Sequence, residues 1–230
     1  VVGVELERTV PGDTAAQHLG AASWVGHEGS PKYVWPQGFS DVADEYDRRY
    51  GLDDVHLAAI ARKAYANAQR NPLAQTRTWS VGADAFGDDD ELNPVVAGRL
   101  RRYDCSQVTD GAAAVVLASP GYAERWAAAR GRRVDDLARI DGWGHRTARM
   151  TMADKLAASR DESYVFPHLR AAALDAFGRA GIAGVDDLDA VETHDCFTIN
   201  EYAALDHLGV TDPGEAWKAI EEGRTELDGD

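Results

Sequence analysis

The stretch VETHDCFTINEYAALDHLG, residues 191–209, carries both the clearest fold signal and the clearest chemical signal in the chain. Its first part completes an apolar run that predicts a strand over 188–196, and its second part predicts a helix over 199–209 that ends at a glycine. Because side chains two residues apart on a strand point the same way, His194 and Cys196 are expected to share one face.

Two interpretations of this histidine and cysteine are open. An imidazole beside a thiol acts as a base and nucleophile, or it holds a water or a substrate oxygen. In the alternative, the cysteine is buried and packs as a small apolar side chain, and the histidine is satisfied by backbone. A motif this short does not decide between them by its spacing alone.

Regular alternation of strand and helix patterns begins near Arg99. This order predicts an α/β protein, with a sheet covered on both faces. Catalytic groups in such sheets often lie where a strand ends and a helix starts, which is where His194, Asp195 and Cys196 fall. The predicted strands are 112–119, part of 136–147, and 188–196, and the predicted helices are 121–131, 168–181 and 199–209.

The first hundred residues are organised differently. Residues 1–7, VVGVELE, predict a buried strand, and 8–38 read as a long irregular stretch with little periodicity. Two helices are predicted over 41–51 and 52–72, the second capped at its start by Asp53 or Asp54. Because a strand at the first residue needs a pairing partner, we expect this chain to be the middle of a longer protein.

Composition limits the classes of function. The formal net charge is −15, which argues against a general nucleic-acid or anionic-membrane binder, because neutralising phosphates needs clustered Lys and Arg. One predicted helix carries Arg62, Lys63 and Arg70. These side chains are expected to point either toward a phosphate or into solvent. The chain has two cysteines, no signal peptide and no long apolar span, so a cytoplasmic, reducing setting is expected.

A second candidate stretch is RRYDCSQVTDGAAAVVLAS, residues 101–119. Its Asp-Gly turn and small residues allow tight backbone packing, and Ser106 and Thr109 are placed to meet a ligand. Alternatively, this is only a turn that feeds a buried strand. His145 and Arg146 form a weaker anion candidate. No Cys/His pair has zinc spacing, and the remaining histidines considered, which lack partners at ligand spacing, are His27, His56, His168 and His207.

These stretches together resemble the thiolase superfamily, specifically the sterol-carrier-protein-type thiolases that include acetyl-CoA acetyltransferases. YDCSQVTDGAAAVVLAS is similar to the opening of that family's C-terminal half, and VETHDCFTINEYAALDHLG to its histidine-aspartate-cysteine-phenylalanine loop and following helix. DEYDRRYGLDDVHLAAIARKAYANAQRNPLAQTR resembles the helical cap between the two halves, and VVGVELE the end of the N-terminal half.

The resemblance implies a layered αβαβα fold. Residues 1–98 would hold the end of the N-terminal half and the cap, and residues 99–230 an incomplete C-terminal half. It implies acyl transfer to or from coenzyme A through a cysteine thioester, with coenzyme A as substrate and no separate cofactor or metal. The loop of His194, Asp195 and Cys196 would be catalytic, with His194 binding the thioester oxygen, and Ser106 would lie near the coenzyme A tail.

The resemblance also implies what this chain lacks. Three catalytic parts of the family match no part of this sequence: the nucleophilic cysteine, the glycine-rich histidine loop and the second catalytic cysteine. Neither Cys105 nor Cys196 takes the place of the missing cysteines. We therefore expect no thiolase turnover from the isolated chain, and a homodimer of the full-length protein. Two alternatives remain: a thiolase-like steroid side-chain aldolase, and a non-catalytic acyl-CoA or lipid-binding subunit.

Overall fold

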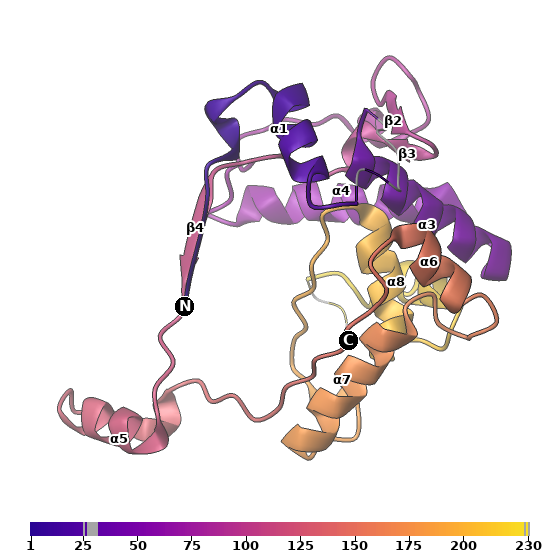
Figure 1. The fold of residues 1–230 in the computed structure, drawn as a ribbon. Coiled ribbons are helices and arrows are strands. Elements are labelled where there is room, and N and C mark those ends of the chain that lie inside the picture. The colour runs from indigo at the N-terminus through magenta and orange to yellow at the C-terminus, as the bar shows by residue number, and fades with distance from the viewer. Residues whose placement is uncertain (25, 27–31, 228, 230) are drawn as a thin grey trace.

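The computed structural model describes residues 1–24, 26, 32–227 and 229. Most of the helices form the body of the molecule (Figure 1). A pair of short strands and one helix form an arm beside it (Figure 1). The helices longer than one turn are α1 (Gly12–Gly20), α3 (Val34–Tyr50), α4 (Asp54–Arg70), α5 (Pro120–Ala128), α6 (Met152–Ala158), α7 (Pro167–Ala180), α8 (Thr198–Leu208) and α9 (Ala216–Glu221). Short 3-10 helices lie at Glu7–Thr9, Ala83–Phe86, Arg102–Asp104, Val134–Asp136 and Val185–Asp187.

The core lies between α3, α4, α8 and α9. The Tyr46 ring of α3 meets the Tyr202 ring of α8 edge to face, with ring centroids 5.1 Å apart, and both side chains are buried. Helix α4 begins as the sequence predicts, because the Asp53 carboxylate accepts the backbone N–H of Val55 at 3.0 Å. Helix α8 ends at Gly209, whose positive φ of 94° is the left-handed conformation that glycine adopts without strain.

The prediction of an irregular stretch over 8–38 was wrong. Helix α1 lies inside it, and α3 begins at Val34, well before the predicted start at residue 41. Pro36 is in the first turn of α3, where a missing N–H costs no helical hydrogen bond, so it does not interrupt the helix. Residues 25 and 27–31 of this stretch, including His27, lie outside the described residues.

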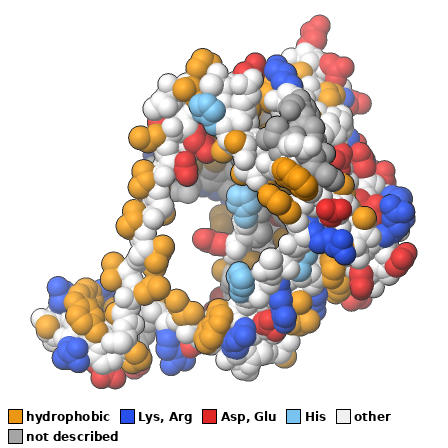
Figure 2. Space-filling model, in the orientation of Figure 1, with side chains coloured by type: hydrophobic (Ala, Val, Ile, Leu, Met, Phe, Trp, Pro, Cys, Tyr) orange, Lys and Arg blue, Asp and Glu red, His pale blue; other side chains and the backbone are white. Residues whose placement is uncertain are grey.

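The strands are shorter than predicted, and only two of them, β1 and β4, fall where strands were expected. β1 (Val2–Glu5) pairs antiparallel with β4 (Gly111–Ala114), with Val2 opposite Ala114, and every residue of both strands is exposed rather than buried. β2 (Val95–Ala97) and β3 (Leu100–Arg101) form a separate hairpin. The arm of β1, β4 and α5 stands apart from the body, with hydrophobic side chains along it and an opening beside it (Figure 2).

The predicted strands within 136–147 and at 188–196 are not formed among the described residues. A strand needs a neighbour for a run of backbone hydrogen bonds, and in the described part of the chain neither segment has a paired strand beside it. The 136–147 segment lies instead against α7. A Cβ on Gly142 or Gly144 would collide with the carbonyl oxygens of Ala176 and Ala172, so glycine at both positions permits this close approach.

Candidate functional site

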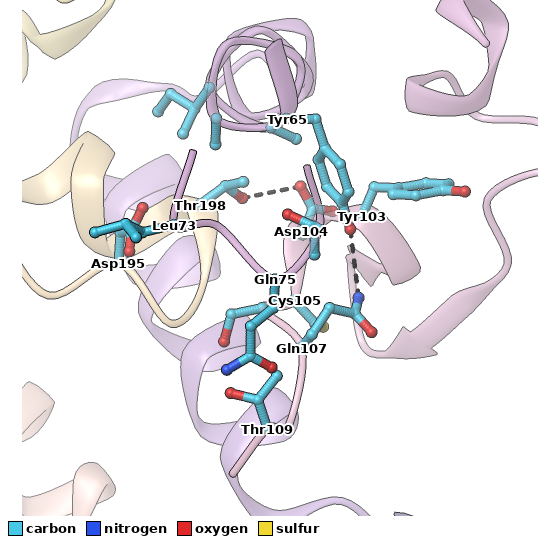
Figure 3. Close-up of a pocket in the computed structure, with 15 residues that line it drawn as sticks. Tyr65, Leu73, Gln75, Tyr103, Asp104, Cys105, Gln107, Thr109, Asp195 and Thr198 are labelled. Carbon is cyan, nitrogen blue, oxygen red and sulfur yellow. Dashed lines mark hydrogen bonds between the residues drawn. The ribbon is translucent and has the colours of Figure 1, made fainter. Parts of the chain in front are cut away.

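A pocket of about 430 Å³ lies between α4, residues 103–109 and the start of α8 (Figure 3). Its wall on α4 consists of a largely apolar stripe at helical spacing. Its polar groups come from the segments after α4 and after β3, from the loop before α8 and from the first residue of α8. A concave site with an apolar wall and a few convergent polar groups is typical of small-molecule binding. The lining residues are Ile60, Ala61, Ala64, Tyr65, Leu73, Gln75, Thr76, Tyr103, Asp104, Cys105, Ser106, Gln107, Thr109, Asp195 and Thr198.

The two candidate stretches of the sequence meet at this pocket. The backbone N–H of Ser106 donates to the carbonyl oxygen of Cys196 at 2.9 Å, and Cys105 forms an isolated antiparallel bridge with Phe197. Phe197 is itself held by α3, where it stacks on Phe39 with ring centroids 4.7 Å apart. Segments about ninety residues apart in the chain are therefore joined backbone to backbone at the edge of one pocket.

A side-chain hydrogen bond also joins the two segments. The Thr198 hydroxyl donates to Oδ1 of Asp104 at 2.9 Å, and the backbone N–H of Arg101 donates to Oδ2 of the same carboxylate at 2.8 Å. Burial raises the pKa of Asp104 above its ordinary value, and these two donors oppose that shift.

Both thiols of the chain lie here, and both are poor nucleophiles. Burial, with the negative charge of Asp195 next, raises the pKa of Cys196 to about 11. Burial, with Asp104 next, raises the pKa of Cys105 to about 12. Since the thiolate is the reactive form, neither cysteine is activated at neutral pH. Asn200 donates to the Cys196 sulfur at 3.3 Å, and Cys105 donates to the Arg101 carbonyl at 3.4 Å.

The structure separates the predicted site residues into two groups. Ser106 and Asp195 line the pocket, and Cys196 is half-buried immediately beside it. His194 is exposed and is not among the lining residues. Because 188–196 is not a paired strand among the described residues, the expected shared face of His194 and Cys196 is not imposed by a sheet.

Sequence reasoning missed the aromatic residues of the pocket wall, Tyr65 of α4 and Tyr103. These two rings contact each other and Phe86, which does not line the pocket, with ring centroids 5.2 to 5.7 Å apart. The Gln107 amide donates to the Tyr65 hydroxyl at 3.3 Å across this wall (Figure 3). The apolar spacing of Ile60, Ala64 and their neighbours along α4 was the only signal available in the sequence.

A second, larger cavity of about 1060 Å³ runs along α4, residues 185–193 and α8, and Asp195 borders it as well as the first pocket. Lys63 lines this cavity and forms a close ion pair with Glu201 of α8, and these side chains are only 11% and 13% exposed. The expectation that solvent surrounds Lys63 is therefore wrong, and a phosphate contact at this residue stays a prediction.

The weaker histidine candidates lie in surroundings that stabilise the fold, away from the two cavities. His56 contacts Glu221 of α9 at 2.9 Å, and His207 is completely buried in the core. Next to His145, Arg146 pairs with Asp175 of α7 at 2.6 Å, which ties its loop to that helix. None of these groups adds a polar atom to the two cavities.

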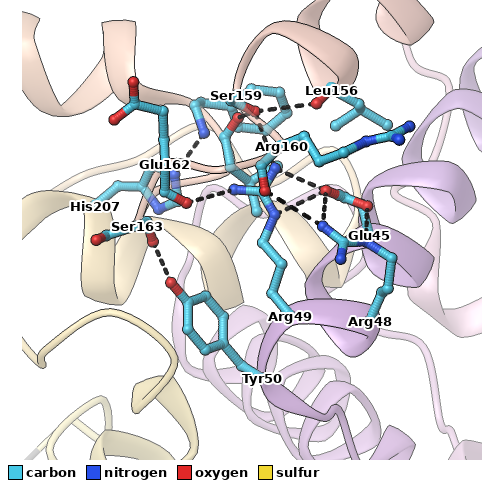
Figure 4. A network of polar contacts seen from close by, with 12 residues as sticks. Glu45, Arg48, Arg49, Tyr50, Leu156, Ser159, Arg160, Glu162, Ser163 and His207 are labelled. Atoms are coloured by element: carbon cyan, nitrogen blue, oxygen red, sulfur yellow. Dashed lines mark hydrogen bonds and ion pairs between the residues drawn. The ribbon is translucent and has the colours of Figure 1, made fainter.

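A charged cluster elsewhere is a structural clamp rather than a site (Figure 4). Glu45 of α3 accepts hydrogen bonds from Arg48 and Arg49. The Arg49 guanidinium continues to the Ser159 hydroxyl at 3.0 Å and the Glu162 carbonyl at 3.1 Å, in the turn between α6 and α7. The side chains of Glu45 and Arg49 are 13% and 5% exposed, so α3 is fixed to this turn by buried charge.

A Glu45→Gln variant is expected to lose about 1–3 kcal/mol of unfolding free energy at pH 7, because charged hydrogen bonds to both arginines are weakened. Arg48 and then Arg49 lower the pKa of Glu45 from 4.5 to about 2. Because the pKa of Glu45 is lower in the folded state, its ionised carboxylate stabilises the folded protein above pH 4.5. This contribution to the unfolding free energy is lost as the pH falls toward 2. Urea unfolding should therefore show the gap between wild type and variant closing over that range.

Glu124→Gln is the matched control for this experiment, because Glu124 is exposed on α5. It is expected to change the unfolding free energy by less than about 0.5 kcal/mol at any of these pH values. A gap between wild type and Glu45→Gln that stays constant from pH 7 to pH 3 would contradict the assignment of the effect to the carboxylate.

Comparison with known proteins shows which proteins this chain is similar to. Residues 151–230 match the family described as "Thiolase C-terminal domain-like". Over 99% of its length the chain is 29% identical to an acetyl-CoA acetyltransferase of Methanothermobacter thermautotrophicus, of which it covers 54%. It is 26% identical to human sterol carrier protein 2 over 94% of the chain and 37% of that protein. The chain thus spans about half the length of such relatives, or less.

A solved structure, "Ltp2-ChsH2(DUF35) aldolase", shares the fold with a TM-score of 0.68, at 21% identity, over 99% of this chain and 56% of that one. The thiolase-like α/β fold predicted from the sequence is therefore confirmed, and at this identity the likeness extends to the fold alone. Residues 151–230 are therefore similar to a thiolase C-terminal domain, and nearly the whole chain is similar to proteins of the thiolase superfamily. Within the part that the structure describes, no helix is long and apolar enough to cross a membrane.

Proposed function

We propose that this chain is part of a thiolase-type acyltransferase, which moves an acyl or acetyl group to or from coenzyme A through a cysteine thioester. One observation carries the proposal: the Ser106 to Cys196 backbone hydrogen bond brings both family-like stretches to the edge of a single pocket. We also propose the division at residues 98 and 99, a homodimer of the full-length protein, and a cytoplasmic location.

The proposed reaction needs a thiolate that attacks a carbonyl carbon of the substrate. With acetyl-CoA, a new carbon–sulfur bond forms, the bond to the coenzyme A sulfur breaks, and coenzyme A leaves as a thiolate that takes up a proton. With acetoacetyl-CoA, the thiolate attacks the keto carbon, the carbon–carbon bond breaks, and acetyl-CoA leaves as an enolate that takes up a proton; coenzyme A then attacks the acyl-cysteine and releases the second acetyl-CoA. Cys105 and Cys196 are unsuited to the attack because burial keeps them as neutral thiols. The nucleophile in this proposal is therefore a cysteine outside this chain, as the family resemblance implies.

His194, Asp195 and Cys196 would then serve the carbonyl oxygen rather than the carbon. Negative charge develops on that oxygen during attack, and a placed donor stabilises it. We assign this donor role to His194, whose ring is exposed and free to face an incoming thioester. Ser106 lies at the pocket edge, where we place the coenzyme A tail.

The test is thiolysis of acetoacetyl-CoA by the longer polypeptide that contains this chain. We expect consumption of acetoacetyl-CoA that depends on added coenzyme A, and mass spectrometry of the trapped protein should find the acyl group on a cysteine other than Cys105 and Cys196. A Cys105→Ser, Cys196→Ser double variant should still form that acyl-cysteine. An adduct on either of those two residues would contradict the proposed roles.

The assay also separates the alternatives. Tight binding of acetyl-CoA without any acyl-cysteine would favour a binding subunit. Cleavage of a carbon–carbon bond in a steroid side-chain thioester, with no need for coenzyme A as acceptor, would favour an aldolase. Either result would replace the acyltransferase proposal.

A further inference from the structure

The loop of His194, Asp195 and Cys196 is attached to the pocket at its carboxyl-terminal end. Two contacts attach this end: the backbone hydrogen bond from the Ser106 N–H to the Cys196 carbonyl, and the antiparallel bridge between Cys105 and Phe197. On the other side, residues 188–195 have no ladder partner among the described residues. The position of His194 therefore depends on how firmly the start of α8 is held.

The start of α8 is held by a partly buried side-chain contact. Thr198 is the first residue of the helix and is 6% exposed, and its hydroxyl donates to Oδ1 of Asp104 at 2.9 Å. The other oxygen of Asp104 accepts the Arg101 N–H at 2.8 Å, which fixes the carboxylate to its own 3-10 helix. A partly buried carboxylate with both oxygens engaged by separate segments orients those segments relative to each other.

We propose that Asp104 and Thr198 are positioning residues that set the placement of the His194–Cys196 loop against Ser106. The pair acts through the loop and does not touch the reacting atoms. This inference rests on the proposed acyltransferase function for its effect on rate. Its effect on the geometry of the loop is independent of that function.

Two substitutions of Thr198 distinguish the effect of its hydroxyl group from the effect of its side-chain shape. Thr198→Val removes the donor and keeps the branched shape, whereas Thr198→Ser keeps the donor and loses the methyl group. Thr211→Val is the matched control, because the Thr211 hydroxyl is buried with no hydrogen-bond partner in the described part of the chain. Urea unfolding of each variant measures stability separately from activity.

In the acyl-transfer assay, Thr198→Val should lower kcat by about 10- to 100-fold, because a small displacement of a catalytic loop costs this much rate. KM should stay within about twofold, since the pocket walls on α4 remain in place, and Thr198→Ser should recover kcat to within about threefold of wild type. Thr211→Val should match wild type. An unchanged kcat in Thr198→Val, or a Thr198→Ser variant as slow as it, overturns the proposal.

If the protein shows no acyl transfer, the proposed function fails and a thiol assay decides the positioning role. Cys196 is half-buried beside the contact, so its reaction with a neutral aromatic disulfide in a Cys105→Ser background reports local opening of the loop. Thr198→Val should speed this modification by about fivefold or more. The assay is run without urea, and the urea midpoint of the variant must be high enough that the protein is fully folded under these conditions. Equal rates in Thr198→Val, Thr211→Val and the parent would then overturn the positioning role.

Discussion

An Asp206→Ala variant is expected to lose about 3–5 kcal/mol of unfolding free energy, the loss typical when one partner of a buried polar network is removed. The Asp206 carboxylate is 1% exposed and accepts from the Tyr46 hydroxyl at 2.7 Å and the Gly214 N–H at 3.1 Å, and it also contacts Nδ1 of His207. Alanine would leave these donors buried and poorly satisfied, which costs more than the hydrogen bonds themselves contribute.

The protonation of this network follows from its hydrogen bonds. Phe166 donates its backbone N–H to Nε2 of His207 at 2.9 Å, so Nε2 is an acceptor and the ring proton lies on Nδ1, toward Asp206 and the Ala203 carbonyl. Burial raises the pKa of Tyr46 far above its ordinary value, so its hydroxyl stays a donor. The network therefore joins α3, α8 and the residue before α7.

Urea unfolding at pH 7 checks this prediction, with Asp212→Ala as the control. Asp212 is exposed in the turn after α8, and its loss should change the unfolding free energy by less than about 0.5 kcal/mol. Tyr46→Phe, which removes only one donor, should cost about 1–2 kcal/mol. Equal stabilities of Asp206→Ala and Asp212→Ala would show that the carboxylate is not needed in the core.

A His194→Ala variant is expected to lower kcat for acetoacetyl-CoA thiolysis by about 10²–10³-fold, the effect of removing one oxyanion donor. The prediction rests on the proposed function, in which His194 binds the thioester oxygen. Because His194 is exposed, the variant should keep its unfolding free energy within about 0.5 kcal/mol of wild type. Steady-state kinetics together with urea unfolding distinguishes a chemical role from a structural one.

His145→Ala provides the matched control, because His145 is also exposed and lies in a loop that borders neither described cavity. Its kcat should stay within about twofold of wild type. His194→Asn, which keeps a donor on a shorter side chain, should recover part of the lost rate if hydrogen bonding to the oxygen is what matters. A His194→Ala enzyme with wild-type kcat would remove His194 from the mechanism.

The sequence by itself determined several of the helices and the resemblance to thiolases. Helices α4, α7 and α8 follow from apolar spacing, the cap at Asp53 and the terminal glycines at 181 and 209, all of which act within a few residues. The resemblance to thiolases was also predicted correctly, because the order and content of the motifs are visible without any structure. The roles of His194, Asp195, Cys196 and Ser106 remain predictions.

The tertiary structure alone decided the strands and the environment of each candidate group. Strand patterns near 140 and 190 did not become strands, since backbone pairing depends on a neighbour that local sequence does not specify. The raised pKa of both thiols, the pairing of Lys63 with Glu201 and the contact of Asp104 with Thr198 all depend on residues far apart in the chain. Burial and partner distance set these properties, and both arise only when α4, residues 101–109 and α8 pack together.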